Sequence, residues 1–332
     1  MQPVYLTGHS RPVRKVMYNS DGDLLFTCSD DGNICMYNTY DCSRVGVFNV
    51  KEAIKSMDVT KDSKHVLAAG TTFGFVIFNA SNGEELQRVT IPVKNIQTKH
   101  VEFALGDQKF LIVYDHNKRS SVRIYDFKSA LLGKNTEGEK EIVGPLDHII
   151  TQASWGPLNK TVYISTDKGR FLIHDIESDK VLVQSELHKS EIFSFTVTYD
   201  HTMIITCGKD GHAKLIHPKT LVPVRVFDFV KPCRNACISP LFDSTDLQKF
   251  HVLLAGGQDA REVTTTQATE GGFSIKLMSM IFNQNLADIT GHFGTVHTLA
   301  FSPDGFTFAS GSEDGYVHFH KLLPEYFTKK FE

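Results

Sequence analysis

Two segments of this chain repeat one another without a gap. Residues 7–38 read TGHSRPVRKVMYNSDGDLLFTCSDDGNICMYN, and residues 290–321 read TGHFGTVHTLAFSPDGFTFASGSEDGYVHFHK. Both copies carry Gly-His near the start and Asp-Gly in a turn before an apolar strand. A pattern of this kind, in a unit of about 40–45 residues, is typical of one blade of a repeat fold made of short strands. The two chain ends therefore predict repeated β-structure that brings the termini together.

Five further units lie between the two copies. A small residue marks the turn before one strand of each unit; the markers are Gly32, Gly74, Ser121, Gly169, Gly211, Gly272 and Gly315. The strands that follow read NICMYN, FVIFN, VRIYDF, RFLIHDI, HAKLIHP, FSIKLMS and YVHFHKL. Alternation of apolar and polar residues indicates strands, and Asp-Gly turns between them indicate hairpins. Seven units predict an all-β fold, a seven-bladed WD40 β-propeller.

The whole chain, residues 1–332, is expected to form one propeller domain. The expected blades are residues 7–47, 48–91, 92–145, 146–186, 187–229, 230–289 and 290–322, and residues 323–332 form a short tail. The last unit shows only three strands before the tail. Because residues 3–6 (PVYL) are apolar and β-prone, we expect them to complete blade seven and close the ring, which removes two open sheet edges.

Composition narrows the class of protein. The net charge is −3 with 22% charged residues, so an electrostatic nucleic-acid binder is not indicated, and the small basic clusters predict weak or absent RNA contact. The six cysteines form no C-x-x-C pair, which favours reduced thiols and a cytoplasmic location. The longest apolar run, Phe110–Tyr114, is too short to span a membrane. His318 and His320 lack a third ligand nearby, so neither a metal nor a cofactor is expected.

Three blades carry a histidine, a hydroxyl residue and an aspartate at matching positions. The sets are His9, Thr27 and Asp31 in blade one; His188, Thr206 and Asp210 in blade five; and His292, Ser310 and Asp314 in blade seven. In WD-type blades such residues form a buried hydrogen-bonded chain, and a buried carboxylate without partners would be costly. A hydrolase triad contains the same residue types. Repetition around a ring favours structural ties over catalysis, so no enzyme is predicted.

Two segments are candidate contacts for a protein partner. Residues 222–230 (VPVRVFDFV) form an expected outer strand of blade five, where Phe227 or Phe229 could receive a partner, with inter-blade packing as the alternative. Aromatic residues of the tail, Tyr326 and Phe327, either anchor a partner or pack on a neighbouring blade.

An atypical loop narrows the prediction further. Residues 256–273 read GGQDAREVTTTQATEGGF, and Gly291–Gly294 read GHFG. The positions of this loop that carry a resemblance to a known family are Gly256, Gly257, Gln258, Ala260, Val263, Thr264, Thr265 and Thr266. The chain resembles, from end to end, the family of subunit i of eukaryotic translation initiation factor 3. The loop is either a contact, with Arg261 as candidate, or an ordered structural loop.

The resemblance implies a function. Its members are non-enzymatic subunits of a factor that binds the small ribosomal subunit and supports assembly of the preinitiation complex and mRNA scanning. The implied partners are sibling subunits b and g, and no homo-oligomer is implied. A helix of subunit b is expected on the side of blades five and six, which makes Asp210 and Asp228 contact candidates beside Phe227 and Phe229. The alternative is a generic WD40 adaptor in signalling or ubiquitin-ligase substrate recruitment.

Overall fold

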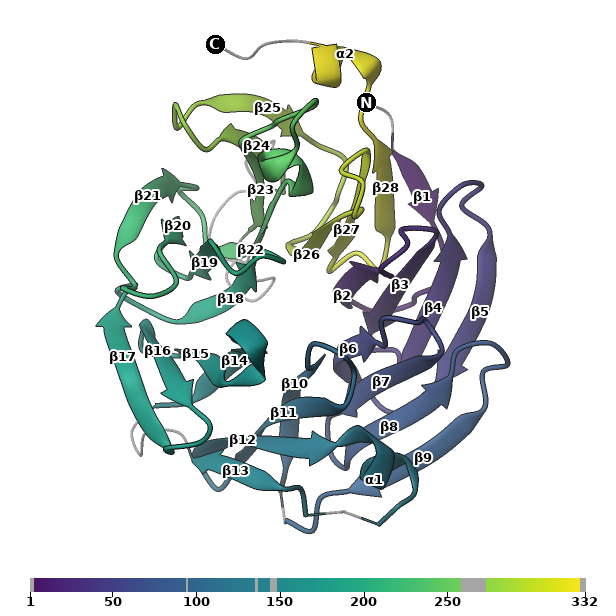
Figure 1. The fold of residues 1–332 in the computed structure, drawn as a ribbon. Helices are drawn as coiled ribbons and strands as arrows, with labels where there is room; N and C mark the ends of the chain where they lie inside the picture. The colour runs from purple at the N-terminus through teal and green to yellow at the C-terminus, as the bar shows by residue number, and fades with distance from the viewer. Residues whose placement is uncertain (1–2, 94, 135–136, 144–147, 258–272, 329–332) are drawn as a thin grey trace, which may run out of the picture.

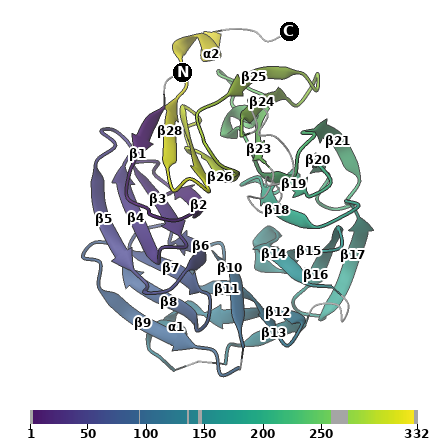
Figure 2. The same cartoon turned by 180° about the vertical axis from the view of Figure 1, so that it is seen from behind.

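Seven antiparallel sheets stand around a central opening in the computed structural model (Figure 1). The structure describes residues 3–93, 95–134, 137–143, 148–257 and 273–328. Each sheet has four strands, and the view from behind shows the same ring (Figure 2). The seven-bladed β-propeller predicted from the repeats is confirmed.

Blades one to four follow the chain in order. Their strands are β2 (Val13–Tyr18), β3 (Leu24–Ser29), β4 (Asn33–Asn38) and β5 (Arg44–Asn49); β6 (Ile54–Val59), β7 (His65–Gly70), β8 (Gly74–Asn79) and β9 (Glu85–Thr90); β10 (Gln97–Phe103), β11 (Lys109–His116), β12 (Arg119–Asp126) and β13 (Lys140–Val143); and β14 (Ile150–Trp155), β15 (Thr161–Thr166), β16 (Arg170–Asp175) and β17 (Lys180–Glu186).

Blades five and six continue the pattern, and blade seven combines both chain ends. The strands are β18 (Ile192–Val197), β19 (Ile204–Gly208), β20 (His212–Ile216) and β21 (Pro223–Asp228); β22 (Cys233–Ile238), β23 (His251–Gly256), β24 (Ile275–Ser279) and β25 (Asn285–Ile289); and β26 (Val296–Phe301), β27 (Thr307–Ser312), β28 (Val317–Lys321) and β1 (Val4–Leu6). The described helices are short: α1 (Phe127–Leu131), η1 (Pro157–Asn159), η2 (Pro240–Asp243) and α2 (Pro324–Thr328).

The N-terminal strand closes the ring, as predicted. β1 pairs antiparallel with β28, with Val4 opposite Phe319 and Leu6 opposite Val317. Leu6 is 4% exposed and belongs to an apolar cluster with residues of blades one and seven. Val4, by contrast, is 44% exposed on the same strand. Closure therefore combines main-chain pairing with one buried side chain.

The core of this protein is divided among the blade interfaces. The ring centroids of Phe48 in blade one and Phe78 in blade two, for example, lie 5.6 Å apart in one apolar cluster. Similar clusters join blades two and three, three and four, four and five, five and six, six and seven, and seven and one. Each blade therefore gains its apolar burial from its two neighbours, as in other repeat folds.

Alternating strand direction sorts the connections onto two faces. Turns between the second and third strands of a blade, and the segments that link blades, lie on one face, which we call the linker face. Turns between the first and second strands, and between the third and fourth, lie on the opposite face. The first strand of every blade carries a bulge at the same level, which bends it beside the central opening.

Leu6→Ala should lower the free energy of unfolding by about 2–4 kcal/mol, because it removes a buried side chain at the closure. Val4→Ala is the matched control, and its effect should stay within about 0.5 kcal/mol because Val4 faces solvent. Denaturant unfolding followed by fluorescence measures both variants. Equal effects of the two substitutions would contradict a closure that depends on Leu6.

Candidate partner-binding surface and buried ties

In blade one the histidine, threonine and aspartate meet as predicted from the sequence. The Nε2 atom of His9 lies 2.8 Å from Oγ1 of Thr27, and its Nδ1 lies 3.1 Å from Oδ2 of Asp31. The carboxylate also accepts hydrogen bonds from the main-chain N–H groups of Ser10, at 3.0 Å, and Asn33, at 2.9 Å. The set thus joins the segment before β2 to β3 and to the turn before β4.

The same geometry recurs in two more blades. In blade five, His188 lies 2.9 Å from the hydroxyl of Thr206 and 2.9 Å from a carboxylate oxygen of Asp210. In blade seven, His292 lies 2.8 Å from Ser310 and 3.0 Å from Asp314. All nine residues therefore come together in three equivalent sets.

The ionisation of these aspartates reflects their partners. Burial alone would raise the pKa of Asp210, but His188 and the main-chain N–H groups of Lys189 and His212 outweigh burial and lower it to about 2. Hydrogen bonds lower the pKa values of Asp31 and Asp314 in the same way, against burial. Burial lowers the pKa of His9. Each set thus holds a carboxylate charged inside the fold.

The blade-seven set has the connectivity of a hydrolase triad, but its hydroxyl is inaccessible. Ser310 is 0% exposed, as are Thr27 and Thr206 in the equivalent sets. A nucleophile must approach a substrate carbonyl at hydrogen-bond range or closer. The buried hydroxyls cannot do so in this fold, and the geometry supports the structural role predicted for the sets.

The third strands of blades one and seven add aromatic contacts around their sets. Tyr37 of blade one donates a hydrogen bond to the carbonyl of Thr7 at 3.1 Å, so it fastens the segment that precedes β2. In blade seven the ring of His318 stacks on that of His292, with ring centroids 3.6 Å apart. The ring of Tyr5 in β1 meets the His318 ring edge-on, with centroids 4.7 Å apart. Imidazole packing thus reaches the strand pair that closes the ring.

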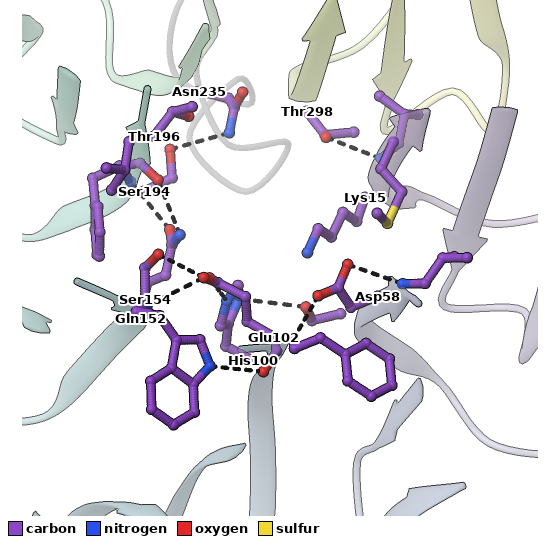
Figure 3. Close-up of a pocket in the computed structure, with 18 of the residues that line it drawn as sticks. Lys15, Asp58, His100, Glu102, Gln152, Ser154, Ser194, Thr196, Asn235 and Thr298 are labelled. Atoms are coloured by element: carbon purple, nitrogen blue, oxygen red, sulfur yellow. Dashed lines mark hydrogen bonds and ion pairs between the residues drawn. The ribbon is translucent and has the colours of Figure 1, made fainter. Parts of the chain in front are cut away.

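The central opening contains a cavity of about 920 Å³ lined by the first strands of the blades (Figure 3). Glu102 accepts a hydrogen bond from Ser154 at 2.7 Å, and its carbonyl accepts one from the indole of Trp155 at 3.2 Å. Asp58 accepts from the N–H of Phe103 at 2.6 Å, and burial raises its pKa to about 6. These acidic side chains link neighbouring blades across the cavity wall.

The structure shows which side chains of residues 223–229 are buried. Phe227 is 0% exposed and Phe229 is 5% exposed; both pack in the cluster between blades five and six, which was the alternative to a partner contact. The phase of the strand turns the phenylalanines inward. Asp228 faces solvent and pairs with His212 at 2.8 Å, whereas Asp210 is occupied in the blade-five set.

Two neighbouring segments, β21 and the β24–β25 turn of blade six, expose apolar side chains, which together we call the apolar ridge. Its members are Val222, Val224, Val226, Ile281 and Phe282, which are 40–61% exposed. The guanidinium of Arg225 donates to the carbonyl of Ile281 at 2.7 Å, and the amide of Asn283 donates to the carbonyl of Val226 at 3.2 Å. These bonds join β21 to the β24–β25 turn. Alternation along β21 already separated Val224 and Val226 from Phe227, so the sequence could have revealed the exposed side of the strand.

The tail aromatics pack against the propeller. Tyr326 is 5% exposed, and its hydroxyl lies 2.8 Å from Nδ1 of His251 in blade six. Phe327 meets Phe306 of blade seven with ring centroids 4.6 Å apart. Packing is thus the alternative that the structure favours for these two residues, over an anchor for a partner.

Some candidates lie elsewhere. Arg261 and the VTTT segment, residues 263–266, fall outside the described residues. His318 and His320 are both buried, and within the described part of the chain no group of three or more His, Cys, Asp or Glu residues is arranged to hold a metal ion.

None of the helices in the described ranges is long and apolar enough to cross a membrane.

The fold and its three buried sets define the class of protein: a seven-bladed propeller of the WD40 type. A family model described as EIF3I matches residues 1–332. The chain belongs to this family, that of eukaryotic translation initiation factor 3 subunit I.

Relatives with that printed name are similar over their full length. The protein of Dictyostelium discoideum is 34% identical over 330 residues, which cover 98% of this chain and 96% of the relative. The human protein is 31% identical over 337 residues, with full coverage of both chains, and that of Drosophila melanogaster is 30% identical over 335 residues, also with full coverage. The similarity supports a role as a translation initiation factor.

Asp314→Ala should lower the free energy of unfolding by about 1–3 kcal/mol, because it leaves buried His292 and two main-chain N–H groups without their acceptor. Asp21→Ala, at an exposed turn position, should change it by less than about 0.5 kcal/mol. Denaturant-induced unfolding curves of the two variants and the wild type provide the measurement. An unchanged midpoint for Asp314→Ala would refute the structural role of the set.

Acid should destabilise the fold through the histidines of β28. His320 is 0% exposed, its ring nitrogens have no hydrogen-bond partner among the described residues, and burial lowers its pKa from 6.5 to about 3. Burial and the nearby His292 lower the pKa of His318 to about 4. Because folded-state values are lowered, the stability that neutral imidazoles allow is complete above pH 6.5 and is lost as the pH falls toward 4 and 3.

His320→Phe tests this pH dependence, because phenylalanine keeps the stacking on Phe308 and has no charge to gain. Between about pH 7 and 5, the free energy of unfolding of the wild type should fall by about 2 kcal/mol more than that of the variant. Parallel pH–stability curves for the two proteins would show that His320 does not titrate in this way.

Proposed function

We propose that this protein is a non-catalytic, cytoplasmic scaffold subunit of eukaryotic translation initiation factor 3. In this role it binds sibling subunits b and g and supports assembly of the small-ribosomal-subunit preinitiation complex and mRNA scanning. Full-length similarity to subunit I proteins supports membership of the complex. The buried hydroxyls of the three histidine sets support a binding role over catalysis.

The apolar ridge is the observation that supports a particular binding surface for this role. Single exposed apolar residues are common, but a contiguous apolar group on one face is a mark of an interaction site. Val224 and Val226 project from the last strand of blade five, and Ile281 and Phe282 extend the ridge onto blade six. An amphipathic helix binds such a surface through its apolar side.

The proposed occupant of the ridge is a helix of subunit b. Asp228, exposed at the end of β21, offers a negative charge beside the ridge that would pair with a basic residue of that helix. Asp210 contributes indirectly, because both of its carboxylate oxygens are engaged within the blade-five set. Phe227 and Phe229 support the ridge from beneath by packing between the blades.

Val224→Asp tests the proposed surface. The charge placed on the ridge should reduce recovery of subunit b in an affinity pull-down at least about tenfold, which corresponds to about 1.4 kcal/mol of binding free energy. The thermal melt should stay unchanged because Val224 is 61% exposed. Mass spectrometry of the recovered proteins provides the measurement.

Val181→Asp is the matched control, since Val181 is 47% exposed on the equivalent outer strand of blade four, β17. It should leave recovery of subunit b unchanged. Normal recovery with Val224→Asp would refute the ridge as the site, and recovery of no initiation-factor subunit by the wild type would refute the scaffold role itself.

A further inference from the structure

The linker face carries a series of lysines on successive blades. Lys168 lies in the turn before β16, Lys189 in the segment between blades four and five, Lys209 in the turn before β20, and Lys231 in the segment between blades five and six. Lys168, Lys189 and Lys209 are exposed, and Lys231 is partly exposed. We call these four residues the lysine arc.

Main-chain hydrogen bonds place the loops that carry the lysines of the arc next to one another. The N–H of His188 donates to the carbonyl of Gly169 at 3.1 Å, so the turn of Lys168 touches the segment of Lys189. The N–H of Lys209 donates to the carbonyl of Glu191 at 2.8 Å. The N–H of Phe229 donates to Gly211 at 2.9 Å, which brings the turn of Lys209 to the segment of Lys231.

Two acidic residues of these loops accept hydrogen bonds within the fold: Asp167 accepts one from the N–H of Ile149 at 2.8 Å, and Asp210 belongs to the blade-five set. Glu191 is partly buried; burial raises its pKa, against the nearby charges of Arg234 and Lys209. Across the described residues, no carboxylate forms an ion pair with the ammonium groups of Lys168, Lys189, Lys209 or Lys231. The arc therefore presents its charge to solvent.

Blade three extends the positive surface. Lys118 and Arg119 lie exposed at the tip of the β11–β12 hairpin, which reaches the same linker face. On the opposite face, the turn between the first and second strands carries an aspartate in every blade except the fourth; these are Asp21, Asp62, Asp107, Asp200, Asp243 and Asp304. The lysines of the arc thus lie on the face opposite to these aspartates.

We infer that the lysine arc binds RNA through its phosphate backbone. Lysine ammonium groups act as point charges that suit phosphates and carry no base preference. A series of cations over adjacent blades matches the regular charge of an extended polyanion better than a single small anion. The inference goes beyond the proposed scaffold role and does not depend on it. Each loop taken alone contains too few cations to predict such a site from the sequence. The fold brings the loops, and with them the lysines, to one face.

The test measures binding of the purified full-length protein to a fluorescein-labelled single-stranded RNA of about 20 nucleotides by anisotropy. Neutralising three or four phosphates of a single strand predicts a slope of about −2 to −3 for log K against log salt concentration. The variant Lys168→Glu/Lys189→Glu/Lys209→Glu should weaken binding at least about tenfold at low salt and flatten that slope.

The matched control, Lys61→Glu/Lys160→Glu/Lys219→Glu, makes the same change of net charge at exposed positions on the opposite face. It should bind within about twofold of the wild type, because those positions lie on the face opposite to the arc and salt screens distant charges. Unchanged melting curves establish that both variants fold. Equal losses in the two variants, or no binding by the wild type at low salt, would overturn the inference.

A competition separates RNA from an acidic protein as the ligand. Unlabelled RNA should displace the labelled RNA at lower charge concentration than poly-glutamate does. Displacement by poly-glutamate at the same or lower charge concentration would assign the arc to an acidic peptide instead and overturn the inference.

Discussion

The packing of each blade against its two neighbours is the interaction on which this protein depends. In the part of the chain that the structure describes, apolar burial is divided among seven blade interfaces. An unclosed array would leave the outer sides of its first and last blades exposed to water. Pairing of β1 with β28 brings those sides together, so the short N-terminal strand protects an interface much larger than itself.

The sequence predicts features that depend on local pattern. Repeated turns mark the blades, and matching positions identify the partners of His9, His188 and His292. Alternation on β21 separates its two sides correctly, yet it does not say which side faces the neighbouring blade; the structure turns Phe227 inward and Val224 outward. The choice depends on the fit against blade six, which is a property of two segments far apart in the chain.

Surface charge shows the same limit. Lys168, Lys189 and Lys209 are separated in sequence by entire strands, so no short window identifies them as one group. The turns that hold them also contain Asp167 and Asp210, and these offset the lysines in any count of charges. In the fold the two aspartates bind main-chain and imidazole groups, while the lysines remain in solvent. The fold therefore exposes the lysines and engages the aspartates, a difference that a count of charges in the sequence does not show.

Closure through β1 also sets an order of events during synthesis. The strand that seals the ring, β1, leaves the ribosome before the six intervening blades, whereas its partner β28 leaves after them. Successive blades can pack as they emerge, since each needs only its neighbour. The first and last sheets nevertheless keep open edges until β28 has been synthesised. The nascent protein is therefore most vulnerable to pairing with another chain just before its own ends meet.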